Sequence, residues 1–111
     1  MNLNTTAYRL LLAERLGKLR TQFKLSQRDF KEPLDLGQNV ILRSEKNLNL
    51  SVDALLTLTL YYIREHDINP NWLFNPDNSD VPMLHSQASF NRRKVNILDY
   101  LAQMIKDEDL L

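Results

Sequence analysis

Apolar residues recur every three or four positions along residues 7–23, which is the spacing of one face of a helix. We therefore expect a first helix there, capped by Thr5 or Thr6, whose short polar side chains suit the first position of a helix. Its predicted buried residues are Tyr8, Leu11, Leu12, Leu16, Leu19 and Phe23.

Two shorter helices are predicted next. Residues 26–29 (Ser-Gln-Arg-Asp) place an acid three positions after a capping serine, so a second helix is expected to begin there, with Phe30 on its buried side. A third helix is expected over residues 38–46, where Ile41 is the apolar position and polar side chains occupy the other faces.

The fourth predicted helix follows the capping residue Ser51. Its apolar residues cover much of the helix circumference, so we expect burial on more than one side, in the middle of a bundle. The residues expected to be buried are Val52, Leu55, Leu56, Leu58, Leu60 and Ile63.

The remaining chain completes the predicted organisation. Asn69 followed by Pro70 predicts a short fifth helix, with Trp72 and Phe74 as core residues. Residues 76–87 read as a linker, and a last helix is expected between residues 89 and 106. Its apolar stripe consists of Val95, Leu98, Leu101, Ala102 and Ile105. The sequence thus predicts an all-α protein: a helical domain over 1–75, a linker over 76–87 and a C-terminal helix over 88–111.

Composition restricts the class of protein. With 43% hydrophobic and 25% charged residues, two glycines and four prolines in 111 residues, the chain is a globular domain able to form long helices. The absence of cysteine excludes disulfides and thiolate metal sites and fits a reducing cytoplasm. No apolar run approaches the roughly 18 residues of a membrane span, so we expect a cytoplasmic protein without membrane contact.

The charges are unevenly distributed along the chain. Lys and Arg outnumber Asp and Glu nine to five in residues 1–50, and the ratio is five to nine in residues 51–111, so the net charge is zero. A basic half beside an acidic half fits a protein that contacts phosphates with one end. The alternative is a chance asymmetry of a solvated surface.

Several short stretches together resemble a known family. They are Arg-Leu-Gly-Lys-Leu-Arg (15–20), Lys-Leu-Ser-Gln-Arg-Asp-Phe (24–30), Asn-Val-Ile-Leu-Arg-Ser-Glu (39–45), Leu-Ser-Val-Asp-Ala-Leu (50–55) and Asn-Pro-Asn-Trp-Leu-Phe (69–74). In this order they are similar to the lambda-repressor-like, or xenobiotic-response-element (XRE), helix-turn-helix proteins over about half of the chain. The resemblance implies a five-helix bundle whose helix-turn-helix lies between residues 25 and 45, with a C-terminal helix in addition.

The resemblance also implies a set of DNA-binding residues. In such a module the second helix crosses the phosphate backbone and the third enters the major groove. Gln38 and Asn39 carry amides that can pair with adenine, and Arg43 can take guanine in a bidentate pair. The full predicted set is Gln27, as a phosphate contact, with Arg28, Gln38, Asn39, Arg43 and Lys46. The plain alternative is that Gln38 and Asn39 only begin a helix and that Arg28 and Lys31 belong to a solvated face.

Some positions support the family pattern and others depart from it. Arg20 and Glu45 stand where the family commonly pairs its first and third helices. Pro33 removes a backbone donor, so we expect the second helix to end near Glu32 or to kink. Asp35 occupies a turn where the family has Gly, and a left-handed conformation is expected there. Ser44 replaces a usually apolar residue.

The sequence therefore predicts a DNA-binding transcriptional regulator without enzymatic activity, cofactor or metal. We expect a homodimer on double-stranded DNA, held together by the C-terminal helix, although that helix has the alternative of folding back onto its own domain. The rival function is an antitoxin or adaptor that keeps the fold and binds a partner protein. His66 and His85 lack neighbours at the spacing of metal ligands, which argues against a metalloenzyme.

Overall fold

The computed structural model describes residues 3–87, and these form an all-α structure whose only β element is an isolated bridge between Ile68 and Leu84. The C-terminal helix predicted between residues 89 and 106 lies outside the described residues. The elements in chain order are α1 (Thr5–Gln22), the 3₁₀ turn η1 (Gln27–Phe30), α2 (Lys31–Leu34), α3 (Gln38–Lys46), α4 (Val52–Glu65) and α5 (Pro70–Phe74).

The helix starts follow from local capping chemistry. Ser51 caps α4 by accepting from the N–H of Ala54, and Asn69 caps α5 by accepting from the N–H of Asn71, as the sequence predicts. The predicted cap of α1 is wrong by one residue. Asn4 accepts from the N–H of Ala7 at 3.0 Å, which leaves Thr5 and Thr6 inside the first turn.

The expected end of the second helix near Glu32 is wrong, because the helix runs on through Pro33 to Leu34. The N–H of Ser26 donates to Asp29 at 2.5 Å and so begins η1, and the geometry changes from 3₁₀ to α after Phe30. Pro33 is the third residue of α2, where a backbone N–H has no partner within the helix to lose. Asp35 ends the helix with φ 54°, the left-handed conformation predicted for it.

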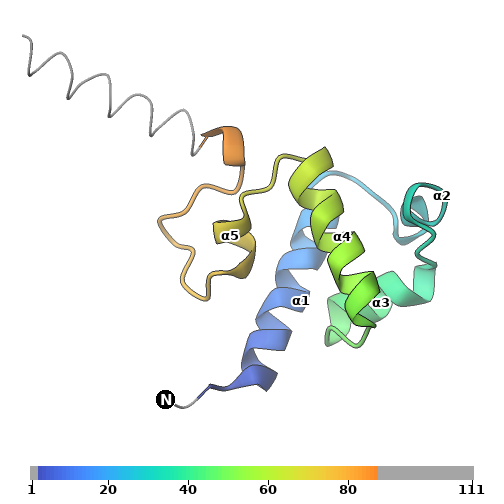
Figure 1. Ribbon diagram of the computed structural model, residues 1–111, viewed down its shortest axis with the longest axis horizontal. Coiled ribbons are helices and arrows are strands. Elements are labelled where there is room, and N and C mark those ends of the chain that lie inside the picture. Colours follow the sequence, from blue (N-terminus) through green and yellow to red (C-terminus); the bar gives the residue numbers. More distant parts are fainter. Residues whose placement is uncertain (1–2, 88–111) are drawn as a thin grey trace, which may run out of the picture.

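The core is built between α1 and the elements around it. Leu12, Leu16 and Leu19 of α1 meet Phe30, Ile41 and residues of α4 and α5. In Figure 1, α2 and α3 lie on one side of α1 and α5 lies on the other, with α4 in front. The buried apolar residues are Leu12, Ala13, Leu16, Leu19, Phe30, Leu36, Ile41, Leu58, Tyr62, Ile68, Trp72 and Leu73.

Two predictions of burial are wrong. On α4, Val52, Leu56 and Leu60 are 71%, 52% and 44% exposed, because only one face of this helix packs on the core and that face carries Leu58 and Tyr62. Phe74 is 38% exposed at the end of α5, whereas Trp72 is buried as predicted.

The stretch predicted as a linker packs on the helices along part of its length. Arg15 of α1 is buried, and its guanidinium donates to the carbonyls of Leu73, Asn75 and Pro76. Farther on, the N–H of Asn69 donates to the carbonyl of Met83 at 2.8 Å. None of the helices between residues 3 and 87 has the length and apolar character needed to cross a membrane.

Candidate nucleic-acid interface

One side of α3 faces the core and the opposite side faces solvent. Ile41 and Ser44 are buried, and the Ser44 hydroxyl donates to the carbonyl of Ile41 at 2.7 Å, so this polar residue is satisfied within its own helix. The exposed residues are Gln38, Asn39, Leu42, Arg43 and Lys46. All four residues that the sequence predicts as DNA contacts on this helix are therefore accessible from solvent.

Gly37 positions the start of this surface. It is the N-cap of α3 with φ −72° and ψ 164°, an extended conformation that does not require glycine. Gln38 and Asn39 follow as the first two helical residues, and Arg43 and Lys46 belong to the last turn. Since a helix rises 1.5 Å per residue, the side chains from Gln38 to Lys46 span about 12 Å along the helix axis.

A hydrogen bond joins the two predicted elements of the site. The Arg28 side chain of η1 donates from Nε to Oε1 of Gln38, with 3.2 Å between the two atoms, and both residues are exposed. This contact leaves the Gln38 amide nitrogen and the Arg28 terminal nitrogens as donors. Gln27, at the first position of η1, is half-buried.

An ion pair sets the angle between α1 and α3. Arg20 binds Glu45 through two hydrogen bonds, Nε–Oε2 at 2.7 Å and Nη2–Oε1 at 3.0 Å, and it also donates to the carbonyl of Leu25. The two side chains are only 22% and 14% exposed. The bonded carboxylate raises the pKa of Arg20, so this guanidinium is charged across the physiological range. The predicted Arg20–Glu45 pair is thus confirmed.

Gly17 allows this close approach of the helices. A Cβ on that residue of α1 would lie 3.4 Å from Oε1 of Glu45, at the limit of ordinary contact. A larger side chain there would push Glu45 away from Arg20. Alanine would therefore fit at this position, whereas a much larger side chain would disturb the ion pair.

Not every cation of the basic half of the chain is available to a phosphate. Arg15 and Arg20 are held by internal contacts, and Lys18 lies 5.9 Å from the centre of the Trp72 ring. Lys31 binds Asp35 at 2.7 Å, and this contact lowers the pKa of the Asp35 carboxyl. The charge count of the sequence could not separate these residues from Arg28, Arg43 and Lys46.

Leu42 also belongs to the exposed surface of α3, although the sequence predicts no role for this residue. It is 49% exposed and lies one turn after Gln38. The signal was present in the sequence, because Leu42 directly follows the buried Ile41 and so points to another face of the helix. An apolar side chain among polar ones widens the chemistry that this surface can recognise.

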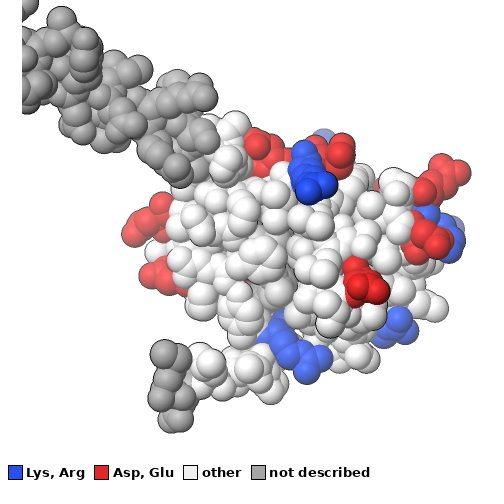
Figure 2. Space-filling view, in the orientation of Figure 1, with Lys and Arg blue, Asp and Glu red and all other residues white. Residues whose placement is uncertain are grey.

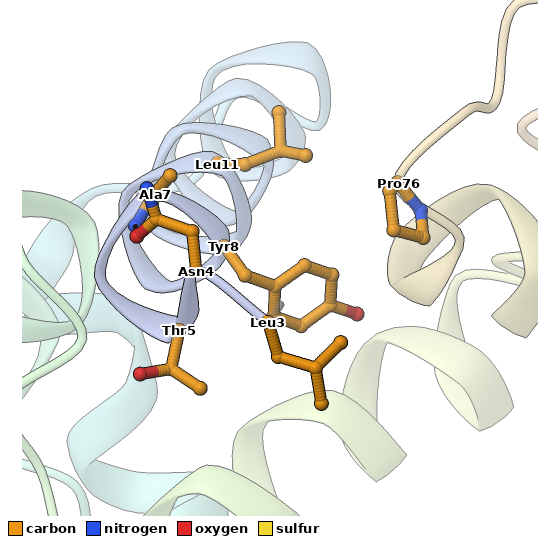
Figure 3. A pocket seen from close by; sticks show the side chains of 7 residues that line it. All are labelled: Leu3, Asn4, Thr5, Ala7, Tyr8, Leu11 and Pro76. Carbon is orange, nitrogen blue, oxygen red and sulfur yellow. Dashed lines mark hydrogen bonds between the residues drawn. The ribbon is translucent and has the colours of Figure 1, made fainter. Parts of the chain in front are cut away.

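The face of the molecule on which α4 lies has a different character. Figure 2 shows uncharged side chains over most of this face, with Lys, Arg, Asp and Glu mainly near its edges. A groove of about 530 Å³ lies between the start of α1 and the loop after α5, and Figure 3 shows Leu3, Tyr8 and Pro76 around it. The Tyr8 hydroxyl donates to the carbonyl of Phe74. This groove adds no charged group to the candidate interface.

An aromatic cluster lies where the end of α1 meets the end of α4. The His66 ring stacks on Phe23 with 4.3 Å between centroids, and its Nε2 lies 3.0 Å from the hydroxyl of Tyr61. Burial lowers the pKa of His66 and raises that of Tyr62. Within residues 3–87, no three His, Asp or Glu side chains lie close enough together to hold a metal ion.

Comparisons with family models, with curated proteins and with solved structures give no match to this chain. The resemblance to lambda-repressor-like proteins therefore rests on the quoted residues alone. The evidence for a function is the surface chemistry of α3 and η1.

Proposed function

We propose that this protein is a sequence-specific, DNA-binding transcriptional regulator of the helix-turn-helix type, in which α3 enters the major groove. The observation that carries the proposal is the division of α3 into two sides. Ile41 and Ser44 anchor the helix in the core, and Asn39, Arg43 and Lys46 are left exposed on it. A major groove about 12 Å wide admits a helix that presents such a surface.

The exposed groups match the chemistry of base edges. Arg43 can donate two parallel hydrogen bonds to O6 and N7 of guanine, and the Asn39 amide can both donate to and accept from adenine. Each such bidentate pair discriminates against a wrong base by about 1–3 kcal/mol. Gln38 is already bonded to Arg28, so its orientation is restricted before DNA arrives. This restriction favours selective recognition, because less side-chain freedom is lost on binding.

Leu42 adds an apolar contact to this set. Thymine carries a methyl group in the major groove that no other base has, and apolar side chains recognise it. An exposed leucine one turn after Gln38 is suited to that contact. We therefore include Leu42 in the recognition surface, together with Gln27, Arg28 and Lys46 as residues that contact phosphates.

A homodimer is part of the proposal. Two-fold symmetry would present two copies of α3 to half-sites about 34 Å apart on a palindromic sequence. Residues 88–111, whose sequence carries apolar residues on more than one side of the expected helix, supply the contact between subunits. Deletion of residues 88–111 is then expected to turn a sedimenting dimer into a monomer, and a truncated chain that still sediments as a dimer would place the interface elsewhere.

The proposed function is tested by DNA binding at two salt concentrations. Mobility shifts with random-sequence duplexes should be strong at about 50 mM salt and much weaker at about 200 mM, because phosphate contacts release counterions. In-vitro selection should then enrich one palindromic sequence. Absence of binding at both concentrations would contradict the proposal.

The rival function is that of an antitoxin or adaptor that binds a partner protein. Two observations favour it: the second helix is broken at Phe30, and Lys31 is paired with Asp35 rather than free for a phosphate. Neither reading requires enzymatic activity, a cofactor or a metal. The salt experiment separates the two, since an adaptor would bind no duplex at either concentration.

A further inference from the structure

The outward side of α4 carries a continuous apolar row. Val52, Leu56 and Leu60 follow one another at intervals of four residues and are 71%, 52% and 44% exposed. This spacing places them one above another on the helix surface, and the half-buried Ile63 extends the row by about one turn. Single exposed leucines are ordinary, but a row along a whole helix marks a surface that something covers. We call these three residues, Val52, Leu56 and Leu60, the α4 row.

The described part of the chain ends beside the same helix. The N–H of His85 donates to the carbonyl of Asp67 at 2.6 Å, and the N–H of Ser86 donates to its carboxylate at 2.9 Å. Asp67 directly follows the C-cap of α4. The chain therefore passes residue 87 next to the C-terminal end of α4, with a further 24 residues to follow.

We propose that residues 88–111 fold back antiparallel to α4 and cover the α4 row of their own chain. Because the chain passes residue 87 at the C-terminal end of α4, a segment that covers the row has to run antiparallel to that helix. The sequence after residue 88 supplies the matching apolar stripe, at Val95, Leu98 and Ala102. This inference goes beyond the proposed function and does not depend on it.

The register of the two stripes follows from counting along both helices. The 14 residues of α4 extend about 21 Å, and a helix of equal length that begins at residue 88 reaches residue 101. Equal distances from the connection place Val95 within about 3 Å of the level of Leu60 and Leu98 within about 1.5 Å of the level of Leu56. Ala102 then lies about 1.5 Å past the level of Val52, at the far end of the row. All three exposed residues thus receive an apolar partner.

This arrangement leaves a second apolar side of the segment uncovered. Ile97, Tyr100 and Met104 are also spaced three or four residues apart, but they fall on a different face from Val95, Leu98 and Ala102. That face remains available to a second copy of the chain. Docking on α4 within one chain and dimerisation through residues 88–111 are therefore compatible.

The proposal is tested by disulfide cross-linking in the 111-residue chain, which contains no native cysteine. The L56C/L98C variant should oxidise in air with a copper catalyst to an internally cross-linked monomer, as two thiols lose their hydrogens to oxygen. Its yield should not depend on protein concentration. The matched control is L10C/L98C, because Leu10 of α1 is 51% exposed and Leu56 is 52% exposed. We expect L56C/L98C to form the internal bond at least about tenfold faster than the control.

The outcomes separate the occupants of the α4 row. A covalent dimer whose yield rises with concentration would assign the row to the segment of a second copy and would overturn the proposal. Equal rates for both cysteine pairs would overturn it as well, since no particular surface would then receive the segment. Circular dichroism of the reduced variants checks that both are folded, which is expected because Leu10 and Leu56 are exposed substitution sites.

Discussion

Helices α3 and α4 were equally clear in the sequence, yet their surfaces were predicted with unequal success. The predicted span of α3, residues 38–46, is confirmed, and Ile41 is buried as expected. The Ser51 cap of α4 is also confirmed, but three of its six predicted core residues are exposed. A helix with few apolar residues shows which side must be buried, whereas a helix with many leaves several orientations with similar burial.

Two substitutions at adjacent residues of α3 give the largest expected difference between a buried and an exposed position. Ile41→Ala should lower the free energy of unfolding by about 2–5 kcal/mol, because it leaves a cavity in the core. Leu42→Ala should change it by no more than about 0.5 kcal/mol, because that side chain is half exposed. Urea denaturation measures both values. Equal losses would mean that α3 is buried on both sides and cannot serve as a recognition surface.

The next largest effect is expected at the ion pair that orients α3. Glu45→Ala should lower the free energy of unfolding by about 1.5–3 kcal/mol, because Arg20 loses two charge-assisted hydrogen bonds at a largely buried site. Glu45→Gln keeps an acceptor for Arg20 and should cost less in the same urea titration. If both variants lose equal stability, the charge of Glu45 is not what holds α1 against α3.

An effect on DNA recognition, without a change in folding, is expected at the exposed end of α3. Arg43→Ala should reduce the preference for the selected sequence over a single-base variant by about 1–3 kcal/mol, or roughly 5- to 150-fold, where Arg43 reads a guanine. Arg9→Ala is the matched control, since Arg9 is an exposed arginine of α1 outside the proposed interface. Fluorescence anisotropy on the two duplexes gives the ratio. An unchanged preference in Arg43→Ala would remove this residue from the recognition set.

The smallest effect concerns pH and the aromatic cluster that α4 shares with α1. Burial lowers the pKa of His66 below its ordinary value of 6.5, so the unfolded chain takes up a proton more readily than the folded protein does. Stability should therefore fall as the pH decreases through that value. His66→Phe keeps an aromatic ring against Phe23 but cannot titrate. Its melting temperature should change less than that of the native protein between about pH 7.5 and about pH 5.5, and an equal change would exclude His66 as the cause.

Local chemistry made much of the candidate interface predictable. The cap at Ser26, the left-handed turn at Asp35 and the start of α3 all depend on residues a few positions apart, so the sequence contains the information. The Arg28–Gln38 hydrogen bond was not predictable in the same way. It joins residues ten positions apart across a turn whose path depends on where the broken second helix ends.

The amino-acid sequence by itself determined the helices and most of their caps, because helical spacing and capping act over a few residues. The pair Arg20–Glu45 was expected only from the resemblance stated above. Tertiary structure alone decided that Arg15 is not free. It became a buried donor to three carbonyls, and these contacts depend on where α5 is placed, whereas Lys31 and Asp35 form a local pair four residues apart. Tertiary structure also decided that the α4 row faces outward. A helix apolar on several sides takes its orientation from the neighbours it packs against, and those are set by the whole fold.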